Sequence, residues 1–128
     1  MLEGRCLCGR VRYQITGPLG PMVHCHCSQC RKASGASFAT NAGVAADAFH
    51  FVAGQDLVGE FESSPGQFRC FCSRCGSPLV KRLAAKPGEL RLRLGTLDSD
   101  PGTRPTTHIF VGSKAPWVEL SDDLPQKP

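Results

Sequence analysis

Eight cysteines fall in three tight clusters along this chain of 128 residues. Two of the clusters share the pattern C-x-C-S-x-C, in which a C-x-x-C step wraps a tight turn whose thiolates converge on one ion. A metal-ligand spacing used twice predicts a small domain organised around bound zinc. The three clusters are Cys6-Leu-Cys8, Cys25-His-Cys27-Ser-Gln-Cys30 and Cys70-Phe-Cys72-Ser-Arg-Cys75.

Disulfide bonds are the competing use of an even number of cysteines in a small chain. The first residues, Met1-Leu2-Glu3-Gly4-Arg5, lack the basic and then apolar run of a signal peptide. The most apolar stretch, residues 42–54, is interrupted by charge and is too short to span a bilayer. C-x-C pairs are also poor disulfide partners, because one intervening residue makes a strained ring. We therefore expect a cytoplasmic protein without a membrane partner, in which the cysteines bind metal.

Length and composition indicate a single domain, residues 1–128, with a modest core. Fourteen glycines and ten prolines are spread evenly and interrupt the chain too often for long helices. No low-complexity segment or Pro/Gly/Ser-rich linker divides the chain. The core alone is therefore too small to stabilise the fold, which leaves a structural role for metal.

The formal net charge of +4 suggests a basic protein, but bound zinc changes the sum. Zinc with four thiolates carries a net charge of −2 and zinc with three carries −1, so one site of each kind leaves about +1. The cations also come in small pairs, which we interpret as solvated surface. They are Arg31-Lys32, Lys81-Arg82, and Arg91 with Arg93. A nucleic-acid-binding domain concentrates its basic residues on one face, so we expect no nucleic-acid partner.

Alternation of apolar and polar residues predicts a mainly β fold with little helix. One helical turn is expected after Cys30, through residues 31–34, and Gly35 closes it. Leu90, Leu92 and Leu94 alternate with polar residues and glycine and give the clearest half-buried strand. The other expected strands are residues 11–15, 37–40, 48–52, 57–61, 78–80 and 107–111.

Spacing also suggests how the thiols divide between two metals. In an extended segment residues i and i+2 project from the same face, so each C-x-C pair can hold one ion. Pairing Cys6 and Cys8 with the turn from Cys72 to Cys75 gives a closed, structural four-thiolate site. Gly9 and Gly76 each follow a cysteine directly, where such a turn often needs a positive φ.

The second cluster then supplies three thiolates, from Cys25, Cys27 and Cys30. Three protein ligands leave one position for water or substrate, which is the pattern of a catalytic zinc. Cys70 leaves two alternatives open: it closes this second site, or it is a small buried thiol in a strand.

The four histidines are expected to be structural rather than metal ligands. His24 and His26 flank the second cluster but point away from its thiols if the segment is extended. His50 and His108 sit in apolar strand segments.

An open site with three thiolates favours exchange of a further soft ligand over activation of water. Three anionic sulfurs donate charge to the zinc and weaken it as a Lewis acid, whereas a substrate thiol is a natural fourth ligand. Zinc keeps that thiol ionised at neutral pH, in the form that attacks a carbonyl carbon. Zinc deaminases are excluded, because they require an H-x-E motif and the chain has none.

The ordered motifs resemble the glutathione-dependent formaldehyde-activating enzyme family, which also includes centromere protein V. The resemblance spans about residues 6–117, with 118–128 as a tail. The motifs are Cys6-x-Cys8-Gly9, Cys25-His26-Cys27-x-x-Cys30-Arg31, Phe71-Cys72-x-x-Cys75-Gly76-Ser77-Pro78-Leu79, and His108-Ile109-Phe110-Val111-Gly112-Ser113-Lys114-Ala115-Pro116-Trp117.

This resemblance implies a β-tent fold of small antiparallel sheets and two zinc ions. It implies a structural zinc on the first four-thiolate set and a catalytic-type zinc on Cys25, Cys27 and Cys30. The implied activity is the addition of glutathione to formaldehyde, classed with the carbon–sulfur lyases.

Two functions from different classes follow from these residues. The first is a zinc-dependent carbon–sulfur lyase acting on a thiol–aldehyde adduct, with Arg31 and Lys32 meeting the carboxylates of an anionic thiol. The second is a non-catalytic module that binds glutathione or another small thiol, or a zinc-ribbon-like interaction domain. Near the C-terminal motif, Phe110 and Trp117 have two alternatives, lining a pocket or packing in the core, and we expect the core.

Overall fold

Short strands make up most of the regular secondary structure, and the mainly β fold class is confirmed. The computed structural model describes all residues, 1–128. The one α-helix is α1 (Ser28–Ser34), and 3-10 turns cover residues 46–48, 55–57, 94–96 and 111–113. The strands are β1 (Leu2–Arg5), β2 (Arg12–Ile15), β3 (Met22–Cys25), β4 (Ala39–Ala45), β5 (Phe49–Ala53), β6 (Val58–Ser64), β7 (Gln67–Cys72), β8 (Pro78–Leu83), β9 (Glu89–Arg93) and β10 (Thr107–Ile109).

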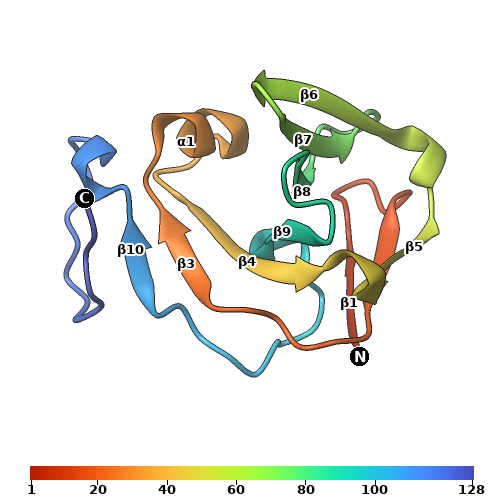
Figure 1. Ribbon diagram of the computed structural model, residues 1–128, viewed down its shortest axis with the longest axis horizontal. Helices are drawn as coiled ribbons and strands as arrows, with labels where there is room; N and C mark the ends of the chain where they lie inside the picture. The colour runs from red at the N-terminus through yellow and green to blue at the C-terminus, as the bar shows by residue number, and fades with distance from the viewer.

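These strands form two sheets. The smaller is antiparallel, in the order β1-β2-β5, and lies at the end of the molecule near the N-terminus (Figure 1). The larger has seven strands in the order β10-β3-β4-β9-β8-β7-β6, and only its β10–β3 pair is parallel. The C-terminal residues lie at the opposite end from the small sheet.

The main core lies where the two sheets face each other. Apolar side chains of β2 and β5 pack against those of β4, β7, β8 and β9, as alternation along half-buried strands predicts. Two cysteines of the predicted structural site belong to this core, so the metal site and the core stabilise each other. The eleven core residues are Cys6, Val11, Tyr13, Ile15, Val44, Phe49, Cys70, Cys72, Leu79, Val80 and Leu92.

Most expected strands are present, and the differences have local causes. The strand expected at residues 37–40 instead runs from Ala39 to Ala45, because residues 36–38 form the bends that follow the end of α1 at Gly35. The alternation did not reveal β1, β3 or β7. β1 and β3 have four residues each, and the cysteines at the end of β7 suggested a metal-binding turn.

The predicted end of α1 is confirmed. Gly35 adopts the left-handed conformation at φ 63°, and its N–H donates to the carbonyl of Arg31 at 2.8 Å. The helix begins earlier than expected, at Ser28. Cys27 is its N-cap residue and Cys30 is buried in its first turn. The second cysteine cluster is therefore held by the junction between β3 and α1.

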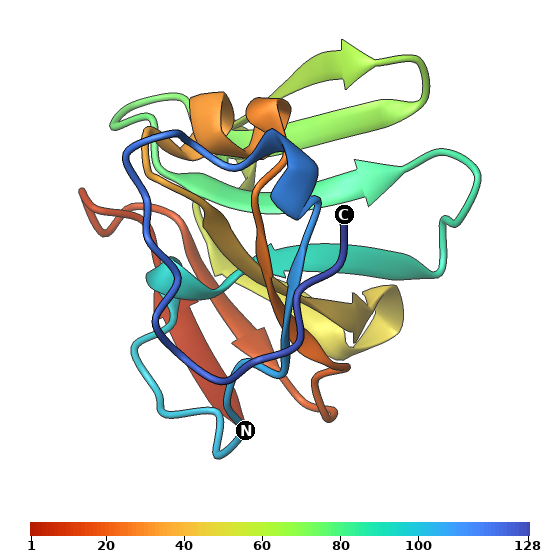
Figure 2. The ribbon, with the colours of Figure 1, turned by 90° about the vertical axis from the view of Figure 1, so that its left-hand side faces the viewer.

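The C-terminal tail pairs with β10. The N–H of His108 donates to the carbonyl of Pro125 at 2.9 Å, and the N–H of Lys127 donates to the carbonyl of His108 at 2.8 Å. Figure 2 shows these last residues running in front of β3 and β10. β10 is an edge strand of the large sheet, and the tail covers backbone groups of β10 that would otherwise be unpaired. No helix has the length and apolarity to cross a membrane.

Candidate metal centre and thiol site

Four cysteines from the two ends of the sequence meet in one cluster. The sulfurs of Cys6, Cys8, Cys72 and Cys75 all lie within 4.8 Å of one another. The sulfurs of Cys6 and Cys8 are 3.5 Å apart, and those of Cys8 and Cys72 are 3.9 Å apart. Thiolates bound tetrahedrally at 2.3 Å from zinc are about 3.8 Å from each other. The spacing and the donor set therefore both fit a four-thiolate zinc site.

Two glycine-containing turns shape this cluster. Gly9 and Gly76 have φ values of 78° and 79°, which confirms the positive φ expected there. Gly76 donates to the carbonyl of Cys72 at 2.7 Å, and Gly9 donates to that of Cys6 at 3.0 Å. Cys6 and Cys8 belong to the turn between β1 and β2, so the extended conformation that we expected for this pair is wrong.

Donors around the cluster favour charged sulfur at Cys6 and Cys75, whereas desolvation and the neighbouring thiols raise the pKa of Cys8 to about 11. The N–H groups of Val11, Arg74 and Cys8 point to the sulfurs of Cys6, Cys72 and Cys75 at 3.3, 3.4 and 3.5 Å. A hydrogen bond from the Ser77 hydroxyl lowers the pKa of Cys75 to about 5. Because zinc binds thiolate rather than thiol, these donors prepare the site for metal.

The second cluster is looser. Cys25, at the end of β3, and Cys30, in α1, are buried and pack together with Ala39. Cys27 is only partly buried, and the three sulfurs do not all lie within the distance that the first cluster spans. Interaction with the Cys25 thiol lowers the pKa of Cys30 to about 5, while the same interaction raises the pKa of Cys25. A metal site on these three cysteines stays a prediction.

Three cations surround Cys30, and sequence reasoning missed them. Arg69 of β7 places Nη2 4.0 Å from the Cys30 sulfur. Arg93 of β9 is only 8% exposed, and Lys81 of β8 is half-buried. After the interaction with Cys25, Arg93 and then Arg69 contribute to the low pKa of Cys30. The interpretation of Lys81 and Arg93 as solvated surface is wrong: paired strands bring these residues together, so only the strand order reveals the group.

Of the two alternatives for Cys70, the structure supports a small buried thiol in a strand. Its side chain is 6% exposed and its thiol donates to Glu60 Oε1 at 3.5 Å. Burial raises the pKa of Cys70 to about 12, which keeps the sulfur protonated. It does not join the four-cysteine cluster.

Three histidines lie together on the side of β3 away from the thiols. His26 Nε2 and His108 Nδ1 are 2.8 Å apart, and Asp122 accepts a hydrogen bond from His108 Nε2 at 2.9 Å. His24 is 2.8 Å from the Thr40 hydroxyl and packs against the His108 ring. The structural role expected for His108 is confirmed, whereas His50 is exposed and not in the core.

Arg31 and Lys32 line a surface hollow of about 360 Å³ together with Trp117. Trp117 is 71% exposed and Phe110 is 53% exposed, so the expectation that these aromatics pack in the core is wrong. Phe110 has a positive φ of 56°, which directs the chain away from β10. A flat, exposed aromatic beside two cations forms a surface that can accept a ligand.

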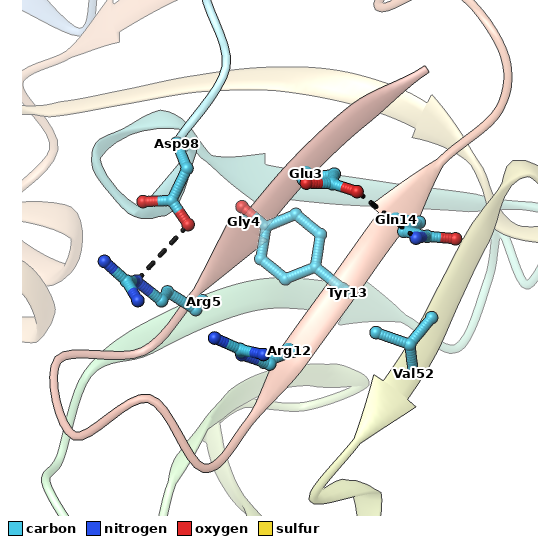
Figure 3. Close-up of a pocket in the computed structure, with 8 residues that line it drawn as sticks. All are labelled: Glu3, Gly4, Arg5, Arg12, Tyr13, Gln14, Val52 and Asp98. Carbon is cyan, nitrogen blue, oxygen red and sulfur yellow. Dashed lines mark hydrogen bonds and ion pairs between the residues drawn. The ribbon is translucent and has the colours of Figure 1, made fainter.

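A further cavity, of about 200 Å³, lies on the outer face of the small sheet (Figure 3). Arg5 forms an ion pair with Asp98 across it at 3.4 Å, and Gln14 donates to Glu3 at 3.4 Å. Its polar groups are thus partly paired with each other, and it contains no cysteine or histidine. The chemistry-bearing residues lie elsewhere, around the two cysteine clusters.

Comparisons with known proteins agree with this geometry. Residues 1–113 match a family described as "Glutathione-dependent formaldehyde-activating enzyme". The chain is 35% identical to a Halomonas elongata protein named "Putative glutathione-dependent formaldehyde-activating enzyme", over 94% of this chain and 81% of that protein. A crystal structure of a Rhodobacter sphaeroides protein shares the fold, with a TM-score of 0.64 and 22% identity over 80% of this chain and 91% of the other.

Proposed function

Because this chain belongs to the glutathione-dependent formaldehyde-activating enzyme family, we propose that it is a zinc-dependent carbon–sulfur lyase. Its substrate is the adduct of a small thiol, glutathione in the first instance, with formaldehyde. The reaction forms or breaks one carbon–sulfur bond, and the thiol proton ends on the former carbonyl oxygen. Two zinc ions per chain are expected, one in each cysteine cluster.

The observation that carries this proposal is the difference between the two clusters. Cys6, Cys8, Cys72 and Cys75 offer four sulfurs close enough to hold one zinc ion, which would leave no position for a substrate. Cys25, Cys27 and Cys30 offer only three thiolates, and Cys70 is engaged with Glu60 instead of adding a fourth. Zinc bound by these three would supply a Lewis acid that keeps a substrate thiol ionised.

The chain's own residues prepare the second cluster for an anionic thiol. The cations around Cys30 favour negative charge there, and burial of Cys25 and Cys30 excludes water. Arg31 and Lys32, in the hollow beside Trp117, are proposed to meet the carboxylates of the thiol substrate. We also propose a cytoplasmic location, because all eight cysteines are free and a reducing compartment keeps them so.

The test compares cysteine variants of the two clusters in zinc-loaded protein. Formation of S-hydroxymethylglutathione from glutathione and formaldehyde is measured above the uncatalysed rate, with zinc content and circular dichroism for each variant. Cys25→Ser is expected to abolish turnover and leave the fold intact, whereas Cys72→Ser unfolds the protein.

Cys70→Ser serves as the matched control, because it alters a thiol outside both proposed ligand sets. It should retain both zinc ions. Wild-type activity in both Cys25→Ser and Cys72→Ser would overturn the assignment. Thiol binding without any acceleration would leave the non-catalytic thiol-binding module as the function.

A further inference from the structure

Arg93 is a buried cation whose hydrogen-bonding groups are not satisfied. Its side chain is more than nine-tenths buried, and neither Nη1 nor Nη2 has a hydrogen-bond partner. A buried charge without a partner is costly, because it loses water and gains nothing in return. The unsatisfied guanidinium points to an anionic ligand that Arg93 meets during function.

Two more cations accompany Arg93 without an acidic partner. Arg69 of β7 lies directly opposite Lys81 of β8 in the sheet register. Like charges directly opposite each other destabilise a strand pair. The ion pairs of the large sheet engage Arg82 with Glu60 and Arg91 with Glu89, and none involves Arg69, Lys81 or Arg93. The unpaired cations therefore gather at one place on the sheet.

The three proposed zinc thiolates do not balance these cations. Zinc with three thiolates carries a net charge of −1, whereas Arg69, Lys81 and Arg93 together carry three positive charges. An additional anion beside the metal would neutralise part of this excess positive charge. Burial lowers the pKa of Lys81 and of Arg93, and the thiolate of Cys30 opposes that shift in both.

A small cavity gives such an anion a place to bind. It has a volume of about 180 Å³, and Arg69 and Arg93 contribute its charged groups. Phe61, which is 64% exposed, Pro78 and Val80 give it an apolar lining. This volume lies below the roughly 300 Å³ at which pockets begin to enclose drug-sized ligands. The cavity therefore suits a carboxylate on a short carbon chain, and Arg93 also lines a separate hollow of about 390 Å³.

We propose that Arg69 and Arg93, which line the cavity, and Lys81, which lies opposite Arg69 in the sheet, form an anion subsite beside Cys30 that binds a carboxylate carried by the substrate thiol within a few bonds of its sulfur. This rests on the proposed function, in that Cys30 helps to bind the substrate thiol. Because Arg69 Nη2 lies 4.0 Å from the Cys30 sulfur, the carboxylate must lie close to the sulfur of the substrate. The site thereby selects small acidic thiols over neutral ones.

The test uses two thiols of similar size, the anionic mercaptoacetate and the neutral 2-mercaptoethanol. Each is titrated by calorimetry into zinc-loaded protein. Wild type should bind mercaptoacetate at least about tenfold more tightly, because a charge-assisted hydrogen bond distinguishes the two. Arg93→Met and, separately, Lys81→Met should reduce that preference. Arg12→Met removes an exposed arginine of the small sheet and should keep it. Zinc content is measured for every variant.

A second readout needs no thiol. Acetate, with acetamide as its neutral control, is titrated while the ¹⁵N signal of the Arg93 side chain is followed by NMR. If acetate shifts this signal but mercaptoacetate binds no more tightly than acetate, the proposed function fails and the anion subsite stands. If both thiols bind equally and acetate shifts nothing, the subsite is overturned and the proposed function stands. A preference for mercaptoacetate that persists unchanged in both Arg93→Met and Lys81→Met would also overturn the anion subsite.

Discussion

At the scale of single residues, Arg93 shows how function and stability oppose each other in this protein. A guanidinium that is buried and unpaired destabilises the folded state in the absence of its ligand. Arg93→Met keeps the length of the side chain and removes the charge, so we expect the free energy of unfolding to rise by about 1 kcal/mol. Urea denaturation of the zinc-loaded variant and wild type measures the difference. A clear loss of stability would mean that Arg93 supports the fold instead.

Gly76 offers a second test at this scale, because its conformation rather than its surroundings excludes a side chain. An added Cβ would meet no atom within 4 Å at Gly76 or at Gly88, but only Gly76 has a positive φ. We expect Gly76→Ala to cost about 1 kcal/mol and to weaken zinc retention at the four-cysteine site, with Gly88→Ala as the near-neutral control. Zinc release to a chelator, followed with denaturation, compares them; equal behaviour of the two variants would contradict this role for Gly76.

At the scale of elements, the strand pairs decide what sequence reasoning could find. Cysteine spacing indicated the four-thiolate cluster, because each pair of ligands is local in sequence and the turn glycines accompany it. The cations around Cys30 come from β7, β8 and β9, and their proximity depends on a register that alternation alone does not fix. Pairs such as Arg91 and Arg93 therefore had the pattern of an exposed strand face.

The tail is the element whose role the sequence left open, and its attachment depends on pH. The hydrogen bond from His108 lowers the pKa of Asp122 below its ordinary value. A carboxyl whose pKa is lowered by folding stabilises the folded state above its unfolded pKa, and that contribution disappears as the pH falls through its folded pKa. We expect the tail to become sensitive to limited proteolysis once this contribution is lost, below about pH 4. Acid at that pH also protonates the zinc-binding thiolates, and the neutral-pH variant is therefore the decisive comparison. Asp122→Asn should show this sensitivity at neutral pH, with Asp123→Asn as the control; identical digestion of both would disprove the attachment.

At the scale of the whole molecule, the four-cysteine cluster joins segments that are far apart in sequence. The turn after β1 supplies Cys6 and Cys8, and the end of β7 and its following turn supply Cys72 and Cys75. Because Cys6 and Cys72 also belong to the main core, removal of metal exposes both the cluster and the packing around it. Prolonged dialysis against a strong chelator is expected to unfold the protein cooperatively, and zinc should restore the fold. Native circular dichroism after complete zinc removal would contradict this role.

The central claim is that one zinc site is closed and structural while the other is open to a thiol. Calorimetric titration of reduced glutathione into wild-type protein of measured zinc content tests it directly, with Cys25→Ser as the comparison. We predict that glutathione binds saturably to wild-type protein with two zinc ions. The Cys25→Ser variant, with only the structural zinc, should not bind glutathione. Two firmly retained zinc ions with no heat of binding from glutathione or mercaptoacetate would contradict the claim, because both sites would then be closed.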